Sequence, residues 1–589
     1  MEYPVLNVKQ KSREMTEAFL GYNHNMRIGD NEFYDMKNMT SDHYPALAPR
    51  KRRGTFAEGT DVNGLIVKEK LCYVKGSSFV IGDEEIDMGL STRPFECPKD
   101  LVSMGAYVII MPDAKYINTV KKNGMHEYGD INRTYMSTGK DVTFTLCTQT
   151  GESYESAEPS NVAPTNPTDG KLWLDTSSTP NTLKKYYKAN GMWVSIATTY
   201  VKIQAQGIGL GFNQYDGVKI EGIVAEGATD LNGSFALWGC KTDEIIITGM
   251  LNKVVTQKAA QGTVAVARLM PVMDFIVESN NRLWGCHYGT TAKGEVVNEI
   301  YASKLGDFKN WDCFMGLSTD SYVASCGTDG PFTGAVSYLG YPLFFKENCI
   351  HKVYGDYPAN YQIQVTNCRG VQKGSDKSLA VVNETLFYKS ANSVCAYDGS
   401  LPVEMSSAFG DVRYSDAVAC AYGNKYYIDM KAADDTYHLF VYDTAKGMWH
   451  KEDNIHVDSF CPYKNEIYAI DYDTGNIVTM FGSGTMDSEK VPWMVETGLI
   501  GMSMPDMKYI SKLLVRMSLE VGAKVEISIQ YDSIGDWERV CQMTATSLRS
   551  FAVPIRPRRC DHFRIRIVGE GDCRIYSITK TIEQGSDVS

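Results

Sequence analysis

The feature that most constrains this chain is a pattern of strand, turn and strand that returns about every 40 residues. In the segment 278–290, ESNNRLWGCHYGT, one apolar run leads into Asn280-Asn281 and a second run leads out. Similar units begin near Asn63, Leu101, Gly334, Ser378, Ala417 and Ser459. Each unit combines a short apolar strand, a turn rich in Gly or Asn and an aromatic strand, with a further turn and strand behind it. The repeat therefore predicts a series of antiparallel, four-stranded meanders.

A four-stranded meander cannot bury both of its faces alone, whereas radial stacking of neighbouring meanders covers them. We therefore predict an all-β chain built around a β-propeller of roughly six to eight blades. The alternative is a set of unrelated hairpins in sandwiches. The composition agrees with either architecture, because 36 Tyr and 51 Gly favour strands and tight turns over helices.

The repeat fails in the middle of the chain and ends before its last hundred or so residues. The segment 158–170, EPSNVAPTNPTDG, is a linker that cannot hold a regular element. In HFRIRIVG, Phe563, Ile565 and Ile567 fall on one face of a strand, which is typical of a half-buried antiparallel sheet. The sequence thus predicts an inserted small β module and a C-terminal β-sandwich. The predicted domains are residues 1–60, an N-terminal arm and first strand region; 61–127, the first propeller blades; 128–265, the inserted β module or modules with the Pro-rich linker; 266–485, the remaining blades; and 490–589, the β-sandwich.

The charge pattern limits the partners of the chain. Its formal net charge is −12 and its pI is near 5.4, so it is not a general binder of nucleic acid. The one dense basic run is PRKRR, which is either a contact for phosphate or an acidic partner, or a solvated loop. The residues that we predict as partner contacts are Arg50, Lys51, Arg52, Arg53, Trp173, Trp193 and Trp311, and we expect Trp493 and Trp537 on exposed, apolar interface surface.

No catalytic signature stands out. The chain has no HExxH, GxSxG or P-loop motif, and its 15 Cys include no CxxC pair. YDTAKGMW and DYDTGNIV are similar to the Asp-box turns of sialidases, but those turns are structural and cap themselves. A sialidase would also need an arginine triad and a tyrosine nucleophile with an acid partner. We therefore expect no catalytic residues, no cofactor and no metal.

The chain shows no signal for membrane insertion. It contains no run of about 18 apolar residues. The first residues, MEYPVLNVKQKSREM, lack the apolar core of a signal peptide. We expect synthesis in a cytoplasm and no membrane insertion.

SNNRLWGCHYG followed by NEIYASKLGDFKNWDCF, and the earlier segment GDNEFYDMKNMTSDHYPALAPRKRRGTF, are two of several motifs whose order is informative. They resemble a blade and the opening, respectively, of the tail stabilisation, or nozzle (hub), proteins of tailed bacteriophages. PTNPTDGKLWLDTSSTPNTLKKYYKANGMWVSI and DGVKIEGI with LNGSFALWG and DEIIITG resemble small modules of phage tail and fibre proteins, and CRIYSITKTIEQGSDVS resembles the end of such proteins.

The resemblance implies a structural virion protein of a phage tail: a nozzle, hub or tail-tip ring in the conduit for DNA ejection. It implies a homo-oligomeric ring, commonly hexameric, that meets adaptor or portal-side and fibre proteins, with DNA passing through its lumen. It also implies assembly in the host cytoplasm and residence in the virion tail, and it brings no catalytic residues. An acidic lumen agrees with this role, because it does not hold phosphates. The alternatives are a carbohydrate-binding propeller for host recognition and a sialidase-like glycan hydrolase.

Overall fold

The computed structural model describes residues 10–59, 61–92, 98–154, 157–290, 294–486, 489–544 and 548–585. Within these ranges the chain consists of β-strands, loops and short 3-10 turns, with no α-helix. The 3-10 turns are η1 (Thr229–Leu231), η2 (Ala259–Gln261), η3 (Pro358–Asn360), η4 (Asp376–Ser378) and η5 (Ser407–Phe409). The predicted all-β class is confirmed.

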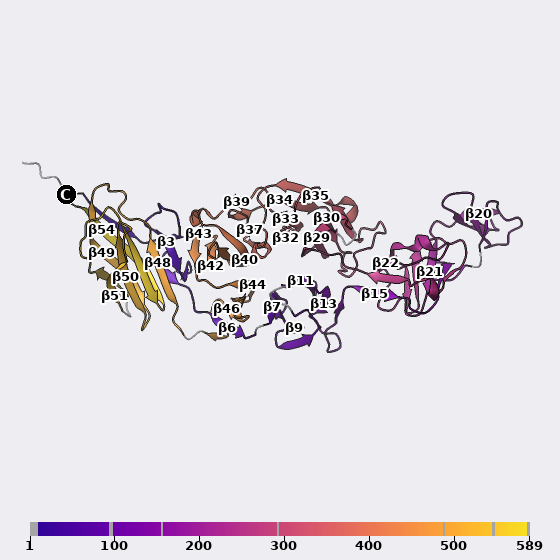
Figure 1. Cartoon of the computed structure of the whole chain (residues 1–589), viewed down its shortest axis with the longest axis horizontal. Coiled ribbons are helices and arrows are strands. Elements are labelled where there is room, and N and C mark those ends of the chain that lie inside the picture. The colour runs from indigo at the N-terminus through magenta and orange to yellow at the C-terminus, as the bar shows by residue number, and fades with distance from the viewer. Residues whose placement is uncertain are drawn as a thin grey trace, which may run out of the picture. The chain divides into compact units, whose positions relative to one another are not determined.

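The chain divides into two compact units. The first comprises Met1–Lys99, Phe344–Ile350 and Val365–Ser589, and the second comprises Asp100–Leu343 and His351–Gln364. Figure 1 labels strands of both units.

In the first unit, repeated antiparallel meanders occupy the segments that the sequence repeat marked (Figure 1). Three of them have four consecutive strands, and a fourth begins with β44, β45 and β46. The strands are β7 (Val62–Val67), β8 (Leu71–Lys75), β9 (Ser78–Ile81) and β10 (Glu84–Asp87); β36 (Ala380–Val382), β37 (Thr385–Lys389), β38 (Val394–Tyr397) and β39 (Val403–Glu404); β40 (Tyr414–Tyr422), β41 (Lys425–Ala432), β42 (Tyr437–Asp443) and β43 (Met448–Lys451); β44 (Val457–Tyr463), β45 (Glu466–Asp471) and β46 (Ile477–Thr479).

The last of these meanders is completed by a strand from the beginning of the chain. β6 (Gly54–Ala57) pairs with β46 through Thr55 and Val478, and the short β47 (Thr485–Met486) pairs with the other side of β6. Gly54 permits this close approach, since a Cβ there would lie 2.5 Å from the carbonyl oxygen of Ser483. The sheet order is therefore β44–β45–β46–β6–β47.

Aromatic residues of the second strands are buried, as the predicted register requires. Phe344, Phe387 and Tyr427 are 0%, 3% and 4% exposed, and Tyr468 is half-buried. Between the sheets that begin with β40 and β44, Tyr427 and its neighbours form one cluster with Ile467. Burial between neighbouring sheets thus stabilises meanders that have no core of their own.

The C-terminal region of the first unit is a pair of packed sheets. One has the order β1–β54–β49–β52, and the other has the order β2–β3–β48–β53–β50–β51. Their bounds are β1 (Lys11–Thr16), β54 (Cys573–Gln584), β49 (Lys508–Leu519), β52 (Arg549–Val553), β2 (Gly21–Tyr22), β3 (Glu32–Lys37), β48 (Pro492–Thr497), β53 (Phe563–Glu570), β50 (Lys524–Tyr531) and β51 (Glu538–Met543). In β53, buried and more accessible residues alternate as the sequence pattern predicted.

The residues that the sequence set apart as an N-terminal arm contribute strands to both of these sheets. β1 pairs with β54, and β3 pairs with β48, so that the indigo β3 lies beside β48 (Figure 1). A further short pair, β4 (Met39–Thr40) with β5 (Ala48–Pro49), precedes β6. Trp493, which we expected on an exposed rim, is only 1% exposed and belongs to the core. That expectation was wrong because alternation along β48 turns its indole inward; Trp537 is half-buried.

The second unit contains two further complete meanders. They are β11 (Asp100–Met104), β12 (Tyr107–Met111), β13 (Lys115–Asn118) and β14 (Tyr128–Asp130), and β28 (Phe275–Ser279), β29 (Arg282–Thr290), β30 (Val296–Ala302) and β31 (Tyr322–Ser325). Asn280 and Asn281 both have positive φ, 53° and 57°, as the turn of a tight hairpin requires. Another sheet, β32 (Gly334–Tyr338), β33 (Tyr341–Lys346), β34 (Cys349–Tyr354) and β35 (Gln362–Asn367), has residues in both units.

The segment between β14 and β28 forms a separate β module with its own hydrophobic core. Its two sheets have the orders β15–β27–β22–β23 and β24–β25–β21–β16–β26, and a four-stranded sheet, β17–β18–β19–β20, is inserted between β16 and β21. The bounds are β15 (Arg133–Met136), β16 (Val142–Cys147), β17 (Glu158–Ser160), β18 (Leu172–Asp175), β19 (Thr182–Tyr187), β20 (Met192–Ser195), β21 (Tyr200–Gln204), β22 (Gly217–Glu221), β23 (Gly233–Ala236), β24 (Gly239–Lys241), β25 (Glu244–Thr248), β26 (Val255–Gln257) and β27 (Ala265–Arg268). β14, at residues that the sequence assigned to the insertion, pairs with β13 instead.

Candidate functional site

The RLWG motif begins with a buried arginine that connects its strand to neighbouring loops. Arg282 is 1% exposed, and its guanidinium donates hydrogen bonds to the carbonyl oxygens of Ser303 (2.8 Å), Ser318 (2.9 Å) and Asp320 (2.5 Å). The backbone N–H of Leu283 donates to Ser303 Oγ at 3.0 Å. A guanidinium with several donors in a fixed fork is suited to joining loop carbonyls. The guanidinium of Arg282 is thus engaged with backbone carbonyl groups.

Two of the three tryptophans predicted as partner contacts are buried. Trp311 is 3% exposed and donates from Nε1 to the carbonyl oxygen of Phe308, and Trp173 is 6% exposed and donates to that of Ser160. A buried indole cannot stack on a sugar, so the expected exposure is wrong for these two residues. Trp193 is half-buried, with its ring 5.4 Å from that of Trp173. Its role as a contact stays a prediction.

The two Asp-box-like segments are self-capped turns. Asp443 accepts the backbone N–H groups of Ala445 and Lys446 at 3.1 and 3.2 Å. Asp471 accepts the N–H of Asp473 at 3.1 Å and the hydroxyl of Thr474 at 2.8 Å. Both carboxylates thus satisfy the backbone of the turn that contains them. The structural interpretation of these motifs is confirmed.

The basic run divides into two inward and two outward side chains. Arg50 and Arg53 form ion pairs with Asp453 at 2.9 and 2.7 Å, and Glu452 Oε2 lies 3.7 and 3.5 Å from the same two residues. These four side chains are largely buried and hold the segment before β6 against the loop after β43. Arg50 and Arg53 are therefore occupied inside the protein.

The other two basic residues remain accessible. Lys51 is exposed, with its ammonium 5.7 Å from the centre of the Phe481 ring, and Arg52 lies 3.9 Å from Glu520. Their role as partner contacts stays a prediction. A solvent-exposed pair at that distance stabilises little, so Arg52 is not fixed by it.

A further acid lies near the buried ion pairs. Asp429 is 1% exposed, and burial raises its pKa to about 8. One carboxylate oxygen accepts the N–H of Val457 at 2.9 Å, while Oδ1 has no hydrogen-bond partner within the described part of the chain. The protonated form of this acid therefore predominates at neutral pH.

A pocket of about 450 Å³ lies beside Lys51. It is bounded by the turns between β40 and β41, between β42 and β43, and between β44 and β45, together with the N-terminal segment. Its lining consists of Asp42, Lys51, Tyr422, Gly423, Asn424, Lys425, Tyr427, Asp443, Lys446, Asn465 and Phe481. All of these residues belong to the first unit.

Two ion pairs fix the charges in this Lys51 pocket. Lys425 lies 2.5 Å from Asp42, and Lys446 lies 3.0 Å from Asp443. Burial acts to raise the pKa of Asp42, but Lys425 outweighs it and the pKa falls below its usual value. Burial is likewise outweighed at Asp443, whose pKa is lowered by hydrogen bonds from Ser41 and Lys446. Both carboxylates stay ionised, so neither is suited to act as a general acid near neutral pH.

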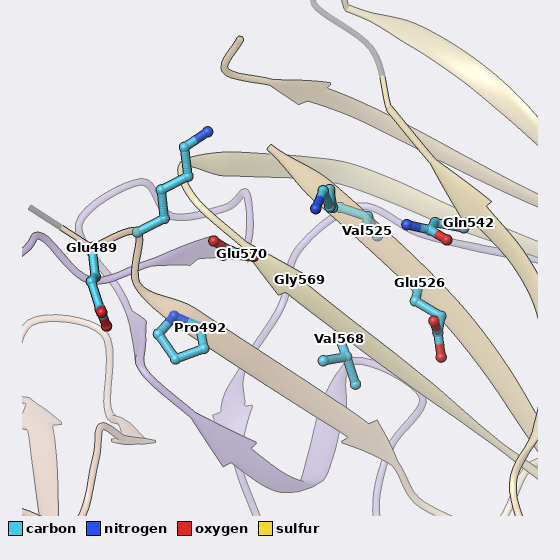
Figure 2. Close-up of a pocket in the computed structure, with 10 residues that line it drawn as sticks. Glu489, Pro492, Val525, Glu526, Gln542, Val568, Gly569 and Glu570 are labelled. Atoms are coloured by element: carbon cyan, nitrogen blue, oxygen red, sulfur yellow. The ribbon is translucent and has the colours of Figure 1, made fainter. Parts of the chain in front are cut away.

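A second, more open groove of about 810 Å³ lies at one end of β48, β53, β50 and β51. Figure 2 shows Glu489, Glu526 and Glu570 around it, with Val525 and Gly569 on the strands that form its base. Lys490 and Lys524 complete its charged lining. Because acidic and basic side chains are mixed around it, this groove indicates no particular ligand.

The described residues show no metal centre and no disulfide. No group of three or more His, Cys, Asp or Glu side chains among them is arranged to hold a metal ion. Their cysteines are free thiols, and burial raises the pKa of Cys461, for example, to about 12. Such a thiol is a poor nucleophile near neutral pH. No helix in the described ranges has the length and apolarity needed to span a bilayer.

Sequence reasoning identified Lys51 but did not identify the pocket beside it. Its remaining lining comes mainly from turns on neighbouring meanders, such as Gly423-Asn424 and Asn465, which read as ordinary turn residues. Only the packing of those meanders brings the turns together. A cluster of Asn and aromatic residues at equivalent turns was the one available signal.

Comparison with known proteins gives structural likenesses alone. No protein-family model matches the chain, and no curated protein sequence matches it. Among solved structures, the computationally designed Ika8 protein is 10% identical, with a TM-score of 0.31 over 73% of this chain and 99% of that one. The exo-beta-1,3-galactanase of Phanerochaete chrysosporium is 8% identical (TM-score 0.20; 52% and 94% covered), and the sialidase of Trypanosoma rangeli in complex with sialic acid is 9% identical (TM-score 0.21; 90% and 96% covered). At these TM-scores the likenesses assign neither a fold nor an activity to this chain.

Proposed function

We propose that this chain is a non-enzymatic structural protein of a bacteriophage tail, part of a nozzle, hub or tail-tip ring through which DNA leaves the particle. One observation carries the proposal: residues of the motif that resembles phage tail proteins make structural contacts inside the chain. Arg282, Ser303 and Trp311 make hydrogen bonds that join strands and loops within the chain. Motif residues that serve the internal architecture of the chain support a structural role.

The proposed architecture is a β-propeller whose blades are the repeated four-stranded meanders. β6 would act as the closing strand, because it completes the meander that begins with β44. Closing a ring with strands from both ends of a repeat array hides the edges that would otherwise pair with other chains. A reconstruction of the purified protein by electron cryomicroscopy tests the number of blades and their closure.

The proposed assembly is a homo-oligomeric ring, with a hexamer expected. The inserted module has exposed apolar side chains, among them Val162, Met192, Leu210, Val224 and Val254. These exposed apolar side chains are available for contact with neighbouring copies. The partners would be neighbouring copies, adaptor or portal-side proteins and fibre proteins, with DNA only in transit, no membrane insertion, assembly in the host cytoplasm and final residence in the virion tail.

Light scattering coupled to size-exclusion chromatography, followed by negative-stain microscopy, tests the assembly. We expect rings, weak binding of duplex DNA that modest salt abolishes, and the chain among the proteins of purified phage particles. A monomer at high concentration that is absent from virions contradicts the proposal. Turnover of a sialoside or galactan at enzyme-like rates would instead favour the hydrolase alternative.

A further inference from the structure

We propose that the Lys51 pocket binds a saccharide that carries one acidic group. The inference goes beyond the tail function, because it rests on the side chains of this pocket and does not depend on oligomerisation. It also places carbohydrate recognition at a different position from the tryptophans that the sequence indicated.

One wall of the pocket is aromatic. The rings of Tyr422 and Phe481 have centroids 5.1 Å apart and are both half-buried, and Tyr427 lies behind them, 6.4 Å from Phe481. An aromatic wall that is partly accessible offers apolar contact to the C–H face of a sugar ring. The space of about 450 Å³ lies within the usual size of small-molecule sites, about 300–1,000 Å³.

Exposed amides face the same space from two turns. Asn465 makes no hydrogen bond within the described part of the chain, and Asn424 accepts one from Asn383 at 3.1 Å. A carboxamide both donates and accepts, and a sugar hydroxyl does the same. Polar groups on fixed turns beside an aromatic wall can therefore orient a polyhydroxylated ring.

The charge balance selects an acidic ligand. Lys425 and Lys446 are matched by Asp42 and Asp443. Lys51 has no ion-pair partner among the residues that the structure describes; Phe481 is its nearest aromatic contact. One unmatched ammonium beside an otherwise neutral lining favours a single negative charge on the ligand.

Saturation-transfer-difference NMR on the full-length protein tests the proposal. The probes are glucuronic acid and galacturonic acid, each beside its neutral counterpart, glucose or galactose, and inorganic phosphate serves as a competitor. We expect saturation transfer to an acidic sugar at lower concentration than to its neutral counterpart. Lys51→Gln should weaken binding of the acidic sugar about tenfold, as for the loss of one charge-assisted hydrogen bond, and leave the neutral sugar unchanged.

Two further variants and a matched control make the outcome decisive. Asn465→Ala and Phe481→Leu should weaken both acidic and neutral sugars, and Asn465→Ala serves alone if Phe481→Leu does not fold. Lys464→Gln is the control, because Lys464 also lies over a ring, that of Tyr463 at 4.8 Å, but does not line the pocket; it should change nothing. The proposal is overturned if no acidic sugar is preferred, if Lys51→Gln keeps the preference, or if phosphate displaces the sugar with equal strength. None of these results bears on whether the protein assembles into rings.

Discussion

The indole of Trp493 occupies the space that a side chain on Gly569 would need. A Cβ at position 569 would lie 2.2 Å from Cζ2 of Trp493, and the indole N–H donates to the carbonyl oxygen of Gly571 at 3.0 Å. The two residues pair across β48 and β53. The widest side chain of the sheet is therefore accommodated by its smallest residue.

Gly569→Ala should destabilise the sandwich by about 2–3 kcal/mol or more, because the indole must leave its position and the core around it is already filled. Thermal unfolding followed by tryptophan fluorescence measures the loss. Gly327→Ala is the matched control, since nothing lies within 4 Å of a Cβ there and its φ is not positive. Equal stability of the two variants would contradict this account of the contact.

Arg282→Lys should destabilise its sheet by about 3 kcal/mol, although it keeps the charge. An ammonium cannot reproduce the fork that reaches three carbonyl oxygens, and it would leave buried acceptors unpaired. The comparison is with Arg369→Lys, at an arginine whose side chain is 55% exposed and pairs with Glu404 at 3.1 Å. Urea unfolding of both variants is the measurement, and a small loss at position 282 would show that the carbonyl contacts are dispensable.

Asp429 should make the protein less stable as pH rises from about 6.5 to 8. Burial raises the pKa of Asp429 to about 8, so the folded state binds a proton there that the unfolded state has already released. The free energy of unfolding then falls with pH by at most about 1.4 kcal/mol per pH unit from this group. Asp429→Asn keeps an acceptor for Val457 and should remove the slope, whereas Asp411→Asn, at an exposed position, should not. Unfolding midpoints at pH 6.5 and 8 decide between these outcomes.

In acid, we expect the stability of the protein to change with pH in the opposite direction. Burial lowers the pKa of His450 to about 3 and that of His438 to about 4. Below about pH 6.5 the two imidazoles bind protons in the unfolded state but stay neutral in the folded state. The free energy of unfolding therefore falls as the pH decreases toward 4. His438→Gln should flatten the unfolding midpoint between pH 6.5 and 4.5. If the unfolding midpoint of His438→Gln still changes with pH as in the original protein, groups other than His438 cause that change.

The contributions of Arg53 and Asp453 to the free energy of unfolding should depend on each other. Arg53→Met leaves the buried carboxylates of Glu452 and Asp453 with Arg50 in place of two arginines and should cost about 3–5 kcal/mol, and the double variant Arg53→Met/Asp453→Asn should cost less than the sum of the single changes. A double-mutant cycle by urea unfolding gives the coupling free energy. Additive losses would show that the 2.7 Å contact contributes little.

The inserted sheet β17–β20 should be removable. β16 and β21 are antiparallel neighbours with Cys147 opposite Tyr200, so the chain leaves and returns at adjacent positions. Replacing 149–198 by Asn-Gly should therefore leave the module core intact, as judged by circular dichroism and resistance to proteolysis. Replacing 205–216, which carries the buried Ile208 and Phe212, is the contrasting variant and should unfold the module.

The local parts of this fold could be predicted because their causes are local. Asn280-Asn281 fixes a hairpin through its own backbone conformation, and the alternation in β53 fixes which face is buried. The pairing of β1 with β54 left no such sign, since it joins residues as far apart as Gln10 and Gln584, which are separated by 574 positions. Contacts of this separation depend on the whole chain.

The site was harder to predict than the fold because exposure is a tertiary property. Trp311 stands between Asn310 and Asp312 in the sequence and reads as a surface residue. Asn310 instead donates within the fold to Asp216 and Asp307, which lets the indole beside it be buried. The Lys51 pocket likewise exists only after three turns and the N-terminal segment have met.

The sheet that β6 completes can form only late in the synthesis of the chain. Gly59 donates to Asn476, 417 positions later, and β6 finds its partner only when β46 has been synthesised. At about 5–20 residues per second, a ribosome needs roughly 20–80 seconds to cover that distance. During this time β6 has no partner strand, although β7 to β10 can already pair with one another, and a product truncated before β46 keeps β6 as an open sheet edge. Only a chain that extends through β46 can complete this sheet, so copies truncated earlier are distinguishable before any assembly begins.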